Sequence, residues 1–308
     1  MVHIIPRDKV RHLEWKPGQE VPPGPNFSRP STPPRTPNPS LSFTIDNILN
    51  NGKHFYNADK DSDNNYIGVA VALKQALEFA SENNGSIASL PYLIAGKSKS
   101  DNDNYLWKDW FTALTEENIG IDKKGKFVSA GKPVVVTVHS GGILTHERIM
   151  RAYKEGLTEQ NAAKYTEDEF NNLLEGRLPS GESISLYTLD DIKNNNIPDP
   201  FARYGIVLDF ETAKSKSSGY HSKSDFMNNE LVIARAGTLD YLDEYFEKAK
   251  RSQGKVGNWH KLNEIDHNQP QGRVLFLVND CNGLYGNISL DNIGRFVVVA
   301  PEAHDAKK

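Results

Sequence analysis

The chain has 308 residues and a single cysteine, Cys281, which excludes an intramolecular disulfide and a cysteine-based zinc site. Its 36 basic and 40 acidic side chains give a net charge of −4, which argues against a nucleic-acid partner. No apolar run approaches the roughly 18 residues that a membrane helix needs, and the first residues lack the apolar core of a secretory signal. We therefore expect a cytoplasmic protein without a membrane partner.

Residues 1–41 hold ten of the seventeen prolines of the chain. Proline lacks a backbone donor and has a restricted φ, so this density excludes a helix or a central strand. We expect an extended proline-rich arm, followed by a single globular body over residues 42–308. The arm could be a leader without fixed contacts. It could instead lie on the body or on a neighbouring copy, and so support a homo-oligomer.

Two amphipathic helices are expected in the first part of the body. Over residues 66–82, apolar side chains recur on one face at helical spacing. The segment YLWKDWFTALTEE, residues 105–117, shows the same pattern through Leu106, Trp110 and Leu114. Residues 120–131 are rich in turn formers and predict a hairpin or a loop.

The apolar run over residues 134–138 predicts a strand that is buried on both faces. The tetrapeptide HSGG follows it, and Thr145 is placed to cap a helix over residues 144–154. A strand, a glycine turn and a helix together can present backbone N–H groups to an anion. This segment is therefore a candidate part of a site.

A capping box formed by Thr166 and Glu169 predicts a short helix that ends near residue 174. Residues 184–187 predict a short strand. Residues 189–201 contain two prolines close together and are expected to be irregular. A boundary between two subregions could fall at residues 189–203.

The segment YGIVLDFET, residues 204–212, predicts a short buried strand that ends in two carboxylates, Asp209 and Glu211. Residues 231–234 predict another strand. Thr238 is placed to cap an amphipathic helix over residues 239–251.

The last apolar runs, residues 274–278 and 296–300, predict two further strands. Helices that alternate with apolar strands predict an α/β or α+β body, in which flanking helices cover a mixed sheet. The strand order stays open. In open α/β sheets, ligands bind beyond the carboxyl ends of the strands. The candidate site residues are therefore the polar ones that follow the strands: His139, Asp209, Glu211, Arg235, Asp280 and Glu302.

Four of these residues are candidate metal ligands. Asp209 and Glu211 lie two residues apart and would share one face if the strand continued that far. Together with Asp280 or Glu302 they could bind a divalent cation such as Mg²⁺ or Mn²⁺, because these ions prefer carboxylate oxygens. The sequence therefore predicts a metal site at the strand ends.

The remaining candidates would act on the substrate. His139 and Arg235 could bind it, and Ser140 could be a nucleophile. The segment VVVTVHSGG resembles the oxyanion loop of the α/β-hydrolases, and Ser140, Asp209 or Asp280, and His304 follow the triad order of that family. The chain lacks the G-x-S-x-G nucleophile elbow that this family has.

A second resemblance concerns Asp209-Phe210-Glu211-Thr212. This tetrapeptide after an apolar strand resembles the first motif of the DnaQ-like exonucleases. The resemblance implies two-metal phosphodiester cleavage, in which both carboxylates bind metal. The later acidic motifs of that family do not occur in the residues that follow.

Two function classes stay open. In one, the chain is a metal-assisted hydrolase with its site around Asp209 and Glu211. In the other, it is a self-assembling structural protein, such as a shell or virion-like component, and residues 1–41 make the contacts between subunits.

Overall fold

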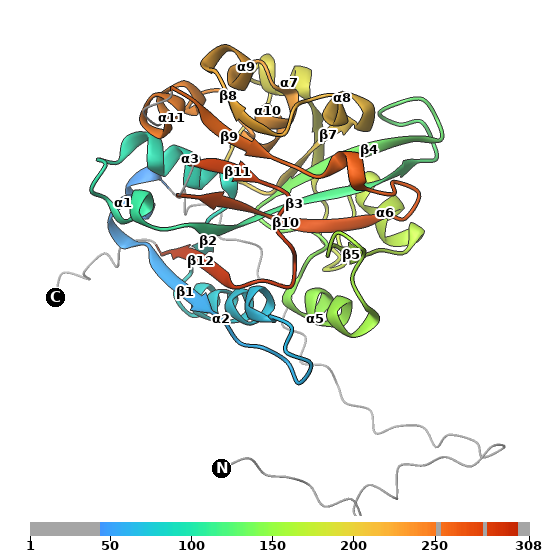
Figure 1. Cartoon of the computed structure of the whole chain (residues 1–308), viewed down its shortest axis with the longest axis horizontal. Helices are drawn as coiled ribbons and strands as arrows, with labels where there is room; N and C mark the ends of the chain where they lie inside the picture. Colours follow the sequence, from blue (N-terminus) through green and yellow to red (C-terminus); the bar gives the residue numbers. More distant parts are fainter. Residues whose placement is uncertain (1–43, 251–253, 280–281, 301–308) are drawn as a thin grey trace, which may run out of the picture. The chain divides into compact units, whose positions relative to one another are not determined.

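A computed structural model describes residues 44–250, 254–279 and 282–300 (Figure 1). These residues belong to one compact unit, Phe43–Lys308. The predictions for the arm, residues 1–41, and for Asp280 and Glu302 lie outside the described residues. No helix in the described segments is long and apolar enough to cross a membrane.

The described residues form a large mixed sheet with the strand order β6-β7-β4-β3-β10-β11-β9-β8, and β5 pairs with β10 beside this path. The central pairs β7–β4, β4–β3 and β3–β10 are antiparallel, whereas β6–β7 and β9–β11 are parallel. The mixed α/β prediction is therefore confirmed. The strands are β3 (Phe111–Asp122), β4 (Lys132–His139), β5 (Ala163–Lys164), β6 (Ser185–Thr188), β7 (Tyr204–Asp209), β8 (Gly219–His221), β9 (Val256–Trp259), β10 (Gln271–Val278) and β11 (Gly283–Tyr285).

A second, smaller sheet joins the two ends of the described unit. Its central strand β12 (Gly294–Val299) pairs antiparallel with β1 (Lys53–Asn57) and with β2 (Ser86–Ile87). Helix α2 (Gly68–Glu82) packs against this sheet, and its buried face includes Val69, Ala72 and Leu73.

Helices cover both sides of the strands (Figure 1). On one side, α2, α5 and α6 enclose an apolar core with Val134, Val136 and Val138 of β4. On the other side, α3 and α11 pack against β10 and β12. Apart from α2, the described helical segments are α1 (Ile45–Asn51), α3 (Leu90–Lys99), α4 (Tyr105–Lys108), α5 (His146–Glu155), α6 (Glu167–Leu174), α7 (Leu189–Lys193), α8 (Phe210–Lys214), α9 (Lys223–Met227), α10 (Glu230–Ala236), α11 (Leu242–Ala249) and the 3-10 turn η3 (Leu262–Glu264).

The elements with strong local signals were predicted correctly. The strand over residues 134–138 is β4, and the helices that follow Thr145 and Thr166 are α5 and α6. The Thr145 hydroxyl accepts the backbone N–H of Arg148, and Thr166 and Glu169 form the predicted capping box. These caps satisfy donors that the first turn of a helix leaves free.

The predicted helix over residues 105–117 is wrong. Only the single turn α4 is helical, and β3 begins at Phe111. Glu116 and Glu117 are both buried within β3, a central strand of the sheet. Hydrogen bonds and an ion pair with residues distant in sequence offset the cost of burying these two carboxylates. The local sequence does not show those partners.

The predicted strand over residues 231–234 is also wrong, because these residues lie in α10. The Asn229 side chain caps this helix by accepting the N–H groups of Leu231 and Val232. Gly237 ends it in the left-handed region, with φ of 68°. The helix is buried on all sides, so its sequence lacks the polar face that would distinguish it from a buried strand.

Two smaller boundaries also differ from the predictions. The helix expected over residues 239–251 begins only at Leu242, and Thr238 does not cap it. Residues 189–201, expected to be irregular, contain α7, which begins with a capping box at Thr188.

Candidate functional site

The sheet does not bring the predicted site residues His139 and Asp209 to one edge. Because β4 and β7 are antiparallel, His139 lies opposite Tyr204, whereas Asp209 lies opposite Val134. The carboxyl ends of these two strands are therefore at opposite ends of the pair, and the parallel-sheet argument does not apply to them.

His139 and Ser140 both make contacts within the fold. The buried His139 ring has Nε2 at 3.0 Å from the Ala234 carbonyl oxygen and Nδ1 at 3.3 Å from the Thr115 hydroxyl. Burial lowers the pKa of His139 to about 3, although the Ala234 hydrogen bond acts in the opposite direction. Ser140 has a positive φ of 62°, and its hydroxyl donates to the Phe201 carbonyl at 3.1 Å.

Asp209 and Glu211 do not share a strand face. Strand β7 ends at Asp209, and α8 begins at the next residue. The Asp209 carboxylate caps this helix by accepting the Thr212 N–H at 2.7 Å. The described part of the chain contains no group of three or more His, Cys, Asp or Glu side chains that could hold a metal ion. The metal site and the hydrolase activity remain predictions.

Arg235 lies in the last turn of α10 rather than at the junction of a strand and a helix. Its Nε and Nη2 donate to the Glu117 carboxylate at 2.7 and 3.0 Å, and Nη1 donates to Asn258 Oδ1 at 2.5 Å. A Cβ atom at Gly286 would overlap both members of this ion pair. Arg235 therefore links α10 to β3 and β9 within the core.

A cavity of about 620 Å³ lies elsewhere, between α5, α6 and the turn over residues 176–183. Its size falls within the range of small-molecule sites. Ile143 and Leu178 give it an apolar floor, and both are buried. Its charged lining residues are Glu147, Arg148, Arg151, Glu169 and Arg177.

A buried carboxylate fixes the floor of the cavity. Glu116 on β3 accepts the backbone N–H groups of Ile143 and Leu144 at 2.7 and 2.8 Å, and the Asn118 amide at 3.0 Å. Burial raises the pKa of Glu116, and these three hydrogen bonds act against that rise. The segment that leads into α5 is thereby attached to the central sheet.

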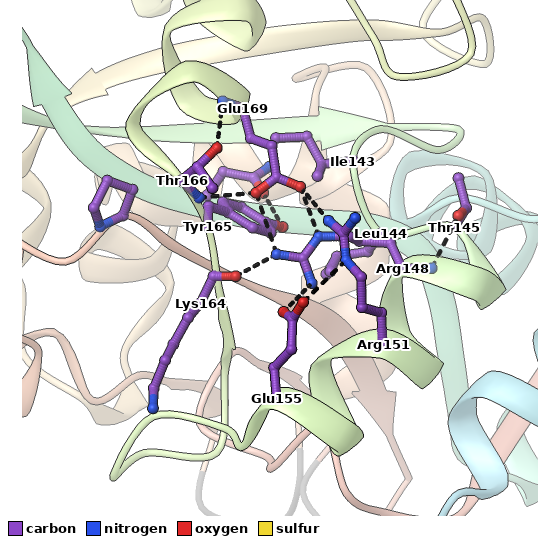
Figure 2. A network of polar contacts seen from close by, with 12 residues as sticks. Ile143, Leu144, Thr145, Arg148, Arg151, Glu155, Lys164, Tyr165, Thr166 and Glu169 are labelled. Carbon is purple, nitrogen blue, oxygen red and sulfur yellow. Dashed lines mark hydrogen bonds and ion pairs between the residues drawn. The ribbon is translucent and has the colours of Figure 1, made fainter. Parts of the chain in front are cut away.

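The wall of the cavity is a polar network around Glu169 (Figure 2). The Glu169 carboxylate accepts Arg148 Nε at 2.8 Å, Arg151 Nη2 at 2.7 Å and the Thr166 N–H at 2.8 Å. Arg148 also donates to the Lys164 carbonyl and lies over the Tyr165 ring. Burial alone would raise the pKa of Glu169, but the hydrogen bonds from Arg148 and Thr166 and the two positive charges lower it overall.

Two arginines of the cavity have incomplete partners within the described residues. Arg148 Nη1 is buried without a hydrogen bond, and the nearest carboxylate oxygen is that of Glu155 at 3.8 Å. Arg177 donates through Nε and Nη2 to the Asn172 side-chain oxygen at 3.2 and 2.8 Å. None of the described carboxylates forms an ion pair with Arg177 within 4.0 Å.

Sequence reasoning pointed to one part of this cavity, the segment between β4 and α5, and missed the rest. Its residues come from α5, α6, the turn over residues 176–183 and the segment between β4 and α5, which contributes Ile143 and Thr145. One local signal was present, because Arg148, Arg151 and Glu155 lie three and four residues apart along α5 and so share a face. Their meeting with Glu169 depends on how α5 and α6 are placed, which the spacing does not show.

The comparisons with known proteins give one match. The chain is similar to a solved structure described as "Accommodation of massive sequence variation in Nanoarchaeota by the C-type lectin fold", with 28% identity and a TM-score of 0.59. The match covers 81% of this chain and 98% of the other. No family model and no curated protein matches the chain. The similarity indicates that this chain shares its architecture with a C-type lectin-fold protein.

Proposed function

We propose that this chain is a recognition protein that binds its ligand in the cavity between α5, α6 and the turn over residues 176–183. The cavity itself carries this proposal. It is large enough for a small molecule, and it is lined by guanidinium and carboxylate groups above an apolar floor. Its best-placed carboxylate, Glu169, is engaged by two arginines, which suits binding better than proton transfer.

The fold similarity supports this proposal. The similar structure concerns a C-type lectin fold that accommodates massive sequence variation. A fold can tolerate such variation when the varied side chains are separate from the residues that hold the framework. The lining of this cavity is divided in the same way. Arg177, Pro179 and Ser183 are exposed and could vary, whereas Ile143 and Leu178 are buried and belong to the framework.

A substitution that fills the cavity tests the proposal. Ser183 lines the cavity and is exposed, so Ser183→Trp should occupy the space without disturbing the core. We expect small molecules from a mixed set of acids, bases and neutral compounds to shift the NMR signals of α5, α6 and residues 176–183. These shifts should be absent in Ser183→Trp.

The control is Ser224→Trp, an equally exposed serine on α9 that does not line the cavity. This variant should bind like the unmodified chain. The proposal is wrong if no compound shifts the cavity signals, or if Ser183→Trp binds as well as Ser224→Trp does.

A further inference from the structure

The charges of the cavity indicate which ligand it binds. On the basis of the recognition function proposed above, we propose that the ligand is a cyclic acid whose carboxylate binds Arg177, with Arg151 as a second donor. Three guanidinium groups line the cavity, against the carboxylates of Glu147 and Glu169. Arg148 and Arg151 form ion pairs with Glu169 and Glu155, whereas Arg177 has no carboxylate within 4.0 Å among the described residues, so an anionic group of a ligand would compensate its charge.

Arg177 is the arginine best placed to bind an acid. It is exposed, lines the cavity and has only a neutral amide partner among the described side chains, since both of its side-chain hydrogen bonds go to Asn172. A guanidinium group has five N–H donors in a planar fork, so most of its capacity stays available. The Asn172 oxygen holds one edge of this fork, which leaves another edge for a carboxylate.

The second donor is Arg151 on α5. Half of its side chain, 52%, is exposed, and it shares Glu169 with Arg148. Glu155 also forms ion pairs with both arginines, at 3.8 Å from Arg148 Nη1 and 3.5 Å from Arg151 Nε, but these contacts are longer than those of Glu169. Each guanidinium group has five N–H donors, more than the carboxylates of this network engage (Figure 2). A ligand with additional acceptor oxygens is therefore favoured.

The apolar floor specifies the rest of the ligand. Ile143 and Leu178 are apolar lining residues of the cavity, and the exposed Pro179 adds hydrocarbon surface to its lining. A ring can cover this surface while a carboxylate on its edge reaches the arginines. A cationic ligand would add a further positive charge beside three arginines and is disfavoured by repulsion.

A matched pair of probes tests the charge. Isophthalate and isophthalamide have nearly the same shape, but only isophthalate carries carboxylates at pH 7. We expect isophthalate to shift the NMR signals of α5, α6 and residues 176–183 in the full chain. The neutral diamide should bind at least about tenfold more weakly, because charge-assisted hydrogen bonds are stronger than neutral ones.

Two variants connect the effect to Arg177. Arg177→Gln should weaken isophthalate binding about tenfold or more. The control Lys250→Met removes one positive charge from the exposed end of α11, which packs in a different core cluster from α5 and α6, and should leave the affinity within about twofold. Both variants should keep the unfolding midpoint of the unmodified chain, because both side chains are exposed.

The outcomes separate this proposal from the recognition function. If isophthalamide binds in the cavity as tightly as isophthalate, or if Arg177→Gln binds isophthalate unchanged, the acid proposal is wrong and the recognition function stands. If neither probe, nor any compound of the mixed set, shifts the cavity signals, the recognition function fails as well.

Discussion

Two arginine–glutamate clusters in the described part of the chain differ in their surroundings. In the core, Arg235 and Glu117 are 0% and 1% exposed and form a two-point ion pair. At the cavity, Glu169 bridges Arg148, which is 7% exposed, and Arg151, which is 52% exposed. The first cluster has no route to solvent, whereas the second forms the wall of an open cavity.

This difference separates stability from binding. A buried charge that loses its partner is costly, because neither water nor another charge can replace it. At the cavity, water or a ligand can reach the donors of Arg151 and Arg177. The same two residue types therefore hold the framework in one place and offer a binding surface in the other.

The largest effect is expected from Glu117→Leu in the core. It leaves Arg235 buried without a carboxylate and should lower the free energy of unfolding by about 3–5 kcal/mol. Adding Arg235→Met should recover part of this loss, because an apolar pair replaces an unpaired charge. Urea denaturation measures both variants. The exposed Glu244, which pairs with Lys99, is the control, and Glu244→Leu should cost less than about 1 kcal/mol.

The contrast between the core cluster and the cavity cluster is wrong if Glu117→Leu lowers the free energy of unfolding no more than Glu244→Leu does. In that case the buried ion pair would contribute no more than a surface pair. The core cluster could then not be distinguished from the cavity cluster by its effect on stability.

A smaller effect is expected from Glu169→Gln at the cavity wall. The loss of hydrogen bonds to two guanidinium groups should cost about 1.5–3 kcal/mol at pH 7. Because the pKa of Glu169 is lower in the folded chain than its ordinary value of 4.5, this contribution is present above pH 4.5. It should be lost as the pH falls through the lowered pKa.

Urea denaturation of the unmodified chain and Glu169→Gln at several pH values between 7 and 2 measures this dependence. The difference in unfolding free energy between the two should shrink on acidification. A difference that stays constant or grows as the pH falls would show that the Glu169 charge does not stabilise the fold.

The smallest effect is expected from Arg177→Ala at the rim. Its side chain is exposed and bonds only to Asn172 among the described residues, so the free energy of unfolding should change by less than about 0.5 kcal/mol. Thermal denaturation measures it. A loss above about 2 kcal/mol would make Arg177 part of the framework and would remove the distinction between rim and core.

Local sequence signals predicted much of the fold. Helices α5 and α6 were predicted because Thr145, Thr166 and Glu169 give capping signals that need no tertiary information. Strand β3 was missed because its two buried glutamates depend on partners that are distant in sequence, such as Arg235. The strand order also depends on such distant pairing, so it stayed open.

The sequence predicted the candidate site less well than the fold. The prediction assumed that polar residues after strands meet at one edge, and the antiparallel register of β4 and β7 separates His139 from Asp209. The cavity instead depends on how two helices and a turn pack. A pattern along one helix, such as Arg148, Arg151 and Glu155, shows that a charged face exists but not what it faces.

A crystal structure of the full chain with isophthalate tests the central claim most directly. The account predicts electron density for isophthalate between α5, α6 and residues 176–183, with its ring over Ile143 and Leu178. One carboxylate should lie about 2.7–3.2 Å from the Arg177 guanidinium nitrogens. Isophthalate bound outside the cavity, or inside it with both carboxylates directed away from Arg177, would contradict the account.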